Sequence, residues 1–160
     1  MTPNGGVDYT RCYHQGVRVP DLDTAMAELG AALSLAWCEP QEREQAVWLP
    51  GIGATTVSLR FTYSAAGPQH VELLQGAPGS VWDGTEQPGL HHVGLWSDDV
   101  AGETERLVAA NWQLRLAQRD PADGYGVFTY VQPPSGLLVE LVSTSVQPMF
   151  ERWFDGGPLA

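Results

Sequence analysis

YHQGVRVPDLD (residues 13–23) and LHHVGLWSDDV (residues 90–100) present one pattern twice in the same chain. In each segment a histidine lies in an apolar stretch that reads as a strand, and an aspartate seven residues later can begin a helix. Each half of the chain then ends in an apolar stretch that carries a single glutamate, QHVELLQ (69–75) and GLLVELVS (136–143). The chain therefore reads as two copies of one unit.

Hydrophobic periodicity and turn residues predict the order β-α-β-β-β in both halves. In the first half we expect strands over 11–19, 46–50, 55–63 and 70–75, with a helix that begins at Asp21 or Asp23 and ends near Ser34. In the second half we expect strands over 90–97, 113–118, 126–132 and 137–143, with a helix that begins at Asp98 or Asp99 and ends near Ala110.

The length of 160 residues predicts one domain, over residues 1–160. Within it we expect a module over 10–76, a Gly- and Pro-rich linker over 77–88, a module over 89–145 and a tail over 146–160. The tail carries four large apolar side chains at helical spacing, which predicts a short amphipathic helix over an apolar surface or a subunit contact. These side chains are Met149, Phe150, Trp153 and Phe154.

The charge balance restricts the partners of the protein. Eight basic residues, all arginine, face 19 acidic ones, for a net charge of −11. Nucleic acid and anionic membrane surfaces are therefore not expected as partners, and a highly anionic substrate is disfavoured unless local arginines override the overall charge. The absence of a long apolar run predicts no membrane span. Two cysteines, Cys12 and Cys38, and a polar beginning of the chain suggest a cytoplasmic protein with buried thiols.

The repeated histidine and glutamate are the strongest chemical signal. An ionised carboxylate inside an apolar strand is costly unless it meets a cation or hydrogen-bond donors. One divalent metal ion with two imidazole and two carboxylate ligands would account for both copies, and zinc, nickel, cobalt, manganese or magnesium suits such a donor set. The alternative is that these residues pair with Arg18 and Arg60. The proposed metal ligands are His14, Glu72, His92 and Glu140.

With these motifs, the sequence resembles the vicinal oxygen chelate superfamily, which includes glyoxalase I, methylmalonyl-CoA epimerase, extradiol dioxygenases and bleomycin-resistance proteins. The resemblance covers about residues 11–145. It implies an α+β fold of two tandem βαβββ modules that form a barrel-like cavity, and a homodimer as the usual state. The family's ligand positions fall on the same four residues. His92 is preferred over His91 because it directly precedes Val93-Gly94.

Within the superfamily, GLHHVGLWSDDV (89–100) is most similar to the epimerase branch. Two departures separate the chain from that branch. The loop before the last glutamate, in PPSGLLVEL (133–141), is short, and the strand AVWLP (46–50) offers no acid. We therefore do not carry the epimerase substrate over to this chain.

The resemblance implies an isomerase, epimerase or lyase in which the metal polarises a carbonyl of a small-molecule substrate and a carboxylate removes the neighbouring proton. Glu140 is the first choice for this base and Glu72 the second. The tryptophan-rich composition favours a neutral or weakly charged aromatic or polyketide-like carbonyl compound.

Two alternatives remain open. The first is a non-catalytic drug- or metabolite-binding protein of the bleomycin-resistance type, in which tryptophans line a groove. Trp96 is the main candidate because its face matches that of His92, whereas packing explains Trp37 and Trp112. The second, ranked lower, is an extradiol dioxygenase. Such enzymes bind their metal with three protein ligands, and the fourth proposed ligand of this chain would occupy the position that oxygen needs. His70 could face the cavity or be solvated.

Overall fold

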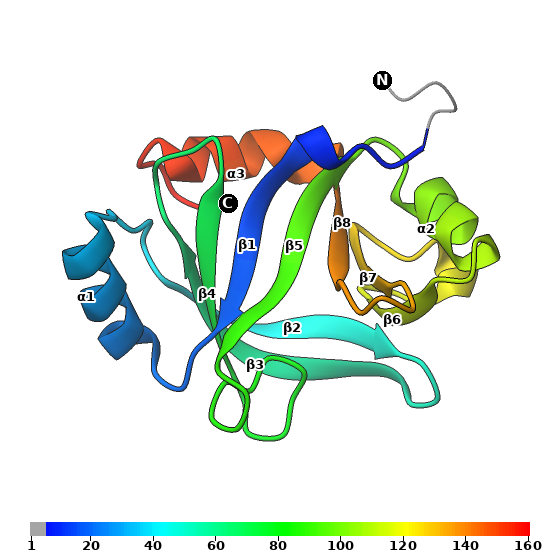
Figure 1. Cartoon of the computed structure of the whole chain (residues 1–160), viewed down its shortest axis with the longest axis horizontal. Helices are drawn as coiled ribbons and strands as arrows, with labels where there is room; N and C mark the ends of the chain where they lie inside the picture. Colours follow the sequence, from blue (N-terminus) through cyan, green and yellow to red (C-terminus); the bar gives the residue numbers. More distant parts are fainter. Residues whose placement is uncertain (1–5) are drawn as a thin grey trace. The chain divides into compact units, whose positions relative to one another are not determined.

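Figure 1 shows the computed structural model, which describes residues 6–160. The first half contains, in order, β1 (Cys12–Arg18), α1 (Leu22–Leu33), β2 (Gln41–Leu49), β3 (Gly53–Tyr63) and β4 (His70–Gly76). This is the predicted β-α-β-β-β order. The bounds of a single domain over 1–160 remain a prediction, and its first five residues lie outside the described part.

The second half repeats the order. It contains β5 (Gly89–Ser97), α2 (Val100–Ala109), β6 (Gln113–Ala117), β7 (Phe128–Gln132) and β8 (Val139–Ser143). The predicted tandem of two βαβββ modules is therefore confirmed.

The tail forms a helix, α3 (Gln147–Phe154), as its aromatic spacing predicts. Three single turns of 3-10 helix complete the described elements: η1 (Tyr9–Arg11), η2 (Pro121–Asp123) and η3 (Thr144–Val146). Among residues 6–160, no helix has the length and apolar character needed to cross a membrane.

The eight strands form one closed barrel in the order β1-β4-β3-β2-β6-β7-β8-β5. The first and last strands of each module pair in parallel, β1 with β4 and β5 with β8. The last two strands of each module pair antiparallel, β3 with β4 and β7 with β8, and β2 pairs with β6. The mixed sheet and its helices confirm the expected α+β class.

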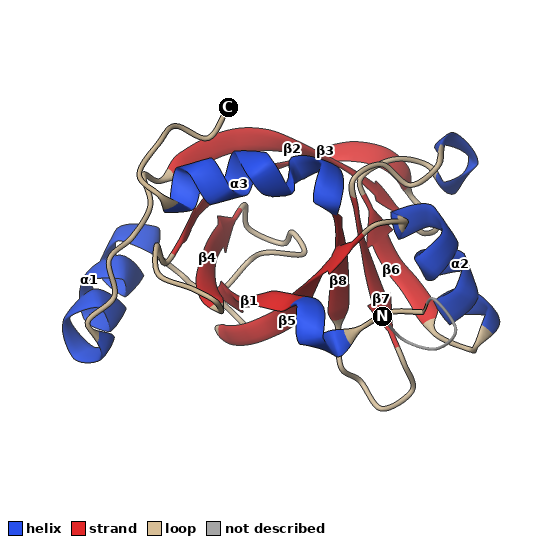
Figure 2. Cartoon of the chain, turned by 90° about the horizontal axis from the view of Figure 1, so that it is seen from above, coloured by secondary structure: helices blue, strands red, loops and turns tan. Residues whose placement is uncertain are grey.

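The described chain divides into two compact units, each with a helix packed on strands (Figure 2). In one unit, α2 lies against β6, β7 and β8, and Val100 packs with Leu95 and Leu141. In the other, α1 lies against β4, and the fully buried Leu22 packs on Leu73. The unit with α2 comprises Met1–Tyr13, Ala46–Thr56 and His92–Gln147. The unit with α1 comprises His14–Gln45, Val57–His91 and Pro148–Ala160.

Strand β2 differs most from its prediction, because it begins at Gln41 rather than at residue 46. Its first half is polar and largely exposed, so hydrophobic alternation could not reveal it. The expectation that this strand offers no acid is therefore wrong, since it carries Glu42 and Glu44.

Both cysteines are buried and form no disulfide, as expected. Burial raises the pKa of the Cys38 thiol to about 11. This thiol is therefore almost entirely protonated at neutral pH, which favours a packing role.

Each long helix begins at an aspartate that caps its first turn. The Asp21 carboxylate accepts a hydrogen bond from the Thr24 N–H, and the Asp99 carboxylate accepts one from the Gly102 N–H, both at 2.9 Å. Of the two candidates at α2, the cap is thus Asp99, whereas Asp98 forms an ion pair with Arg11.

Asp99→Ala is expected to lower the free energy of unfolding by about 1 kcal/mol, because the N–H at the beginning of α2 loses its acceptor. Asp99→Asn changes the charge equally but keeps a side-chain oxygen, so its loss should be much smaller. Urea unfolding followed by circular dichroism measures both variants. Equal losses would show that the charge, and not the cap, stabilises the helix.

Candidate metal centre

The first histidine–glutamate pair lies on two neighbouring parallel strands. In the register of β1 and β4, His14 is opposite His70 and Gly16 is opposite Glu72. These four residues therefore share one face of the sheet. His14 Nε2 lies 3.3 Å from Glu72 Oε1, and the two side chains are 0% and 10% exposed. The predicted residues of the first module are thus brought together in a nearly buried pair.

The second pair repeats this geometry on β5 and β8. Gly94 is opposite Glu140, and His92 lies two residues before the glycine. His92 Nε2 is 3.3 Å from Glu140 Oε1, with side chains 0% and 12% exposed. His92, rather than the neighbouring His91, is the histidine that joins the glutamate.

A glycine is opposite each glutamate in the register of the parallel strands. Gly16 and Gly94 have no side chain to place next to the carboxylates of Glu72 and Glu140. On that face, the next side chain along the first strand is the histidine two residues earlier. The sequence pattern His-x-Gly on the first strand and Glu on the last therefore produces the contact.

The four residues of these two pairs, called the metal cluster, could hold a metal ion with one ligand atom each. Ligand atoms about 2.1 Å from a common ion are roughly 3 to 3.5 Å from their neighbours, and the 3.3 Å in each pair matches this spacing. Two nitrogens and two carboxylate oxygens form a donor set that divalent transition metals accept.

The competing explanation, in which Arg18 and Arg60 neutralise these carboxylates, is wrong. Arg18 donates to the Val81 carbonyl at 3.2 Å and to Gln87 Oε1 at 3.1 Å. Arg60 pairs with Glu42 at 2.8 Å and with Asp23 at 3.3 Å. Both arginines are therefore engaged by other partners than these carboxylates.

An aromatic cover lies over the face that carries the first pair. Tyr63 is opposite Glu72 in the register of β3 and β4, and its ring centroid is 5.1 Å from that of His14. Helix α3 packs on this tyrosine through three aromatic rings whose centroids lie 5.5–5.6 Å from it. The rings of this aromatic cover belong to Phe150, Trp153 and Phe154.

His70 belongs to the same covered face. It is only 6% exposed, donates from Nδ1 to the Ser64 carbonyl at 2.6 Å and stacks on Phe154 at 3.8 Å. Burial lowers the pKa of its imidazole, and the carbonyl contact acts in the opposite direction. It is therefore neither solvated nor free to bind a ligand through Nδ1.

The tryptophans are mainly packed. Trp96 is 9% exposed and stacks on Tyr13 at 3.8 Å, so its ring face is already occupied. Trp37 donates to the Met26 carbonyl at 2.9 Å, and Trp112 packs on the core beneath α2. Packing explains Trp37 and Trp112, as expected.

Tyr63 and Arg43 act on the first pair but were not singled out from the sequence. The Arg43 guanidinium lies 4.7 Å from the centre of the Phe61 ring. Strand alternation through the polar segment QEREQ (41–45) would have been the signal for this arginine, but no apolar residue marks that segment as a strand.

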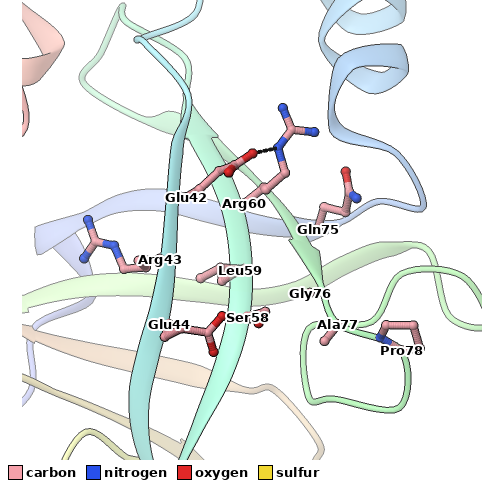
Figure 3. A pocket seen from close by; sticks show the side chains of 10 residues that line it. All are labelled: Glu42, Arg43, Glu44, Ser58, Leu59, Arg60, Gln75, Gly76, Ala77 and Pro78. Carbon is pink, nitrogen blue, oxygen red and sulfur yellow. Dashed lines mark hydrogen bonds and ion pairs between the residues drawn. The ribbon is translucent and has the colours of Figure 1, made fainter.

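Figure 3 shows a pocket of about 520 Å³ beside β2, β3 and residues 76–78 that includes none of the four proposed ligands. Its acids are engaged, since Glu42 pairs with Arg60 and Glu44 accepts a hydrogen bond from Ser58. Glu42 and Glu44 therefore contribute no chemistry to the metal cluster, and the remaining charged residue of the lining is Arg43.

Comparison with known proteins identifies a family. Residues 13–129 match a family model described as the Glyoxalase/Bleomycin resistance protein/Dioxygenase superfamily. No curated protein matches the chain.

Solved structures share the fold at low identity. A Streptomyces coelicolor methylmalonyl-CoA epimerase in complex with 2-nitronate-propionyl-CoA is 18% identical, with a TM-score of 0.59 over 84% of this chain and 94% of that chain. A Mycobacterium tuberculosis methylmalonyl-CoA epimerase is 16% identical, with a TM-score of 0.54 over 84% of this chain and 87% of that chain. A hypothetical protein from Bacillus halodurans is 16% identical, with a TM-score of 0.56 over 83% of this chain and 93% of that chain. At these identities, the similarity shows the fold alone.

Trp153→Ala is expected to lower the free energy of unfolding by about 3–5 kcal/mol, because this 1% exposed ring anchors the aromatic cover. Trp153→Phe should cost much less. It keeps an aromatic ring and removes no hydrogen bond, since Nε1 has no partner among the described residues. Urea unfolding monitored by circular dichroism compares the variants, and equal losses would contradict the packing role.

Proposed function

Since the chain belongs to the glyoxalase/bleomycin resistance protein/dioxygenase superfamily, we propose that it is a metal-dependent enzyme that removes a proton next to a carbonyl group. The observation that carries this proposal is the pair of histidine–glutamate contacts, each at 3.3 Å and nearly buried. The reaction type is an epimerisation, an isomerisation or an elimination of a small molecule.

His14, Glu72, His92 and Glu140 would hold a divalent ion, with zinc, nickel, cobalt, manganese and magnesium as candidates. When bound, such an ion acts as a Lewis acid that stabilises negative charge developing on a substrate oxygen. The histidines and glutamates would fix its position, because the strand register sets each histidine next to its glutamate.

Proton transfer is assigned to the carboxylates. We assign the base to Glu140 first, because Glu72 shares its face with Tyr63, which the aromatic cover encloses. Each carboxylate keeps about a tenth of its side chain exposed, so a substrate can approach it. The carboxylate takes the proton from carbon and returns it to the same carbon or to another atom.

The solved epimerases support the proposal through fold only, at 16–18% identity. The substrate is therefore left open, and methylmalonyl-CoA is one compound to test. A cytoplasmic location and a homodimer also stay predictions.

A ligand-binding protein without catalysis is the alternative. It requires an open aromatic groove, whereas Trp96 is stacked on Tyr13. A dioxygenase ranks third, because a site that used both Glu72 and Glu140 as ligands would fill the position that oxygen needs.

Elemental analysis tests the metal centre. The purified full chain is expected to carry close to one divalent ion, and His92→Ala and Glu140→Ala should lose it. His91→Ala removes a neighbouring histidine outside the cluster and should retain the ion. A folded wild-type protein that takes up none of the five candidate metals would overturn the enzyme and favour the binding protein.

Proton exchange tests the base. In D₂O, the wild type is expected to catalyse deuterium incorporation next to the carbonyl of at least one compound in a panel of thioesters, 1,3-dicarbonyl compounds and hemithioacetals. Glu140→Gln keeps an oxygen ligand and should reduce the exchange rate by about 10²–10⁴-fold, and more than Glu72→Gln does. NMR measures the rate, with metal content as control. A larger loss in Glu72→Gln would reverse the assignment.

A further inference from the structure

The side chain of Arg43 extends from β2 on the side opposite to those of Glu42 and Glu44. In Figure 3 its side chain points away from Glu42, Arg60 and Gln75, which gather on the other side of the strand. This follows from the alternation of side chains along a strand. The arginine is therefore separated from the two glutamates that flank it in the sequence.

The face that Arg43 reaches is the face of the first histidine–glutamate pair. Phe61 is opposite Leu74 and Tyr63 is opposite Glu72 in the register of β3 and β4, so Phe61 and Glu72 lie on one face. The Arg43 guanidinium lies over the Phe61 ring at 4.7 Å from its centre. The positive charge thus lies over the face of the sheet that also carries Glu72.

The electrostatic environment agrees with this placement. Burial lowers the pKa of the Arg43 guanidinium, while the Tyr63 phenol and the Glu72 carboxylate act in the opposite direction. Arg43 as a residue nevertheless remains exposed, so an incoming molecule can reach it.

No carboxylate among residues 6–160 forms an ion pair with Arg43. Arg11 and Arg60, by contrast, pair with acids. The neighbours of Arg43 are also engaged, since Glu42 binds Arg60 and Glu44 accepts from Ser58. A cation–π contact orients a guanidinium but leaves its N–H donors available.

We propose that Arg43 binds an anionic group of the substrate, a carboxylate or a phosphate, while the carbonyl of the same molecule lies at the metal cluster. The planar guanidinium can donate two parallel hydrogen bonds to either group. This inference rests on the proposed function and narrows its substrate class from carbonyl compounds to carbonyl compounds with an acidic group.

Matched hydroxamates test the inference by binding, without turnover. A hydroxamate head chelates divalent metals, and a chain of one to four methylenes ends in a carboxylate, in its uncharged methyl ester or in a phosphonate. Titration calorimetry of the metal-loaded full chain measures the dissociation constants. In the wild type, an acidic probe of suitable length is expected to bind about tenfold or more tightly than its ester.

Arg43→Met should abolish that preference and leave ester binding unchanged. Arg43→Lys should recover part of it, because the charge remains but the fork of donors is lost. Arg119→Met removes an equal charge from an exposed position after β6 and should keep the full preference. Circular dichroism confirms that each variant is folded.

The outcomes separate the two proposals. If the ester binds in a metal-dependent way but Arg43→Met keeps the acidic preference, or if the wild type has none, the role of Arg43 is wrong and the metal site stands. If no probe binds the loaded wild type, both proposals fail. A preference for phosphonate over carboxylate supports the role and identifies a phosphate as the anionic group.

Discussion

Two carboxylates lie nearly enclosed in the sheet, and each faces an imidazole nitrogen at 3.3 Å. A neutral histidine offers a carboxylate a single N–H, which does not replace the water that an ionised group loses on burial. Arg18 and Arg60 could have supplied positive charge, but both are bonded elsewhere. The parallel register of β1 with β4 and of β5 with β8 brings each histidine next to its glutamate, and a bound cation would favour the ionised form of the carboxylates.

Much of this arrangement is readable in the sequence, because a repeated fold must place equivalent residues on equivalent strands. The histidines and glutamates stand at matching positions of the two copies, so their pairing follows from strand parity and element order. The helix caps were also predictable to within two residues, since Pro20 directly precedes Asp21 and Asp99 follows the end of the strand by two residues.

Other features depend on information that is not local. The polar half of β2 has no hydrophobic alternation, and it becomes a strand because β3 offers it hydrogen bonds and partners such as Ser58 for Glu44. The spacing of Phe150, Trp153 and Phe154 predicts an apolar helix face but not the surface that receives it. That surface, around Tyr63 and His70, becomes identifiable only from tertiary packing.

The two modules share the histidine–glutamate distance of 3.3 Å, but aromatic rings of α3 pack over the face of the first pair. The aromatic cover encloses its face from α3, which lies beyond the residues that match the family model. A cover of aromatic rings limits the size of what can lie beside His14 and lowers the local polarity. Within such a setting, one charged donor has more effect on ligand choice than it would in open solvent.

Net charge and local charge act over different distances in this protein. The net charge of −11 repels anions at long range, but salt screens that repulsion beyond about 8 Å at physiological ionic strength. Contact with a guanidinium is decided within hydrogen-bonding distance, where screening is weak and geometry dominates. An acidic chain can therefore bind an acidic small molecule. The overall charge reduces the rate of encounter, whereas Arg43, held over Phe61, would determine the affinity and orientation of the bound anion.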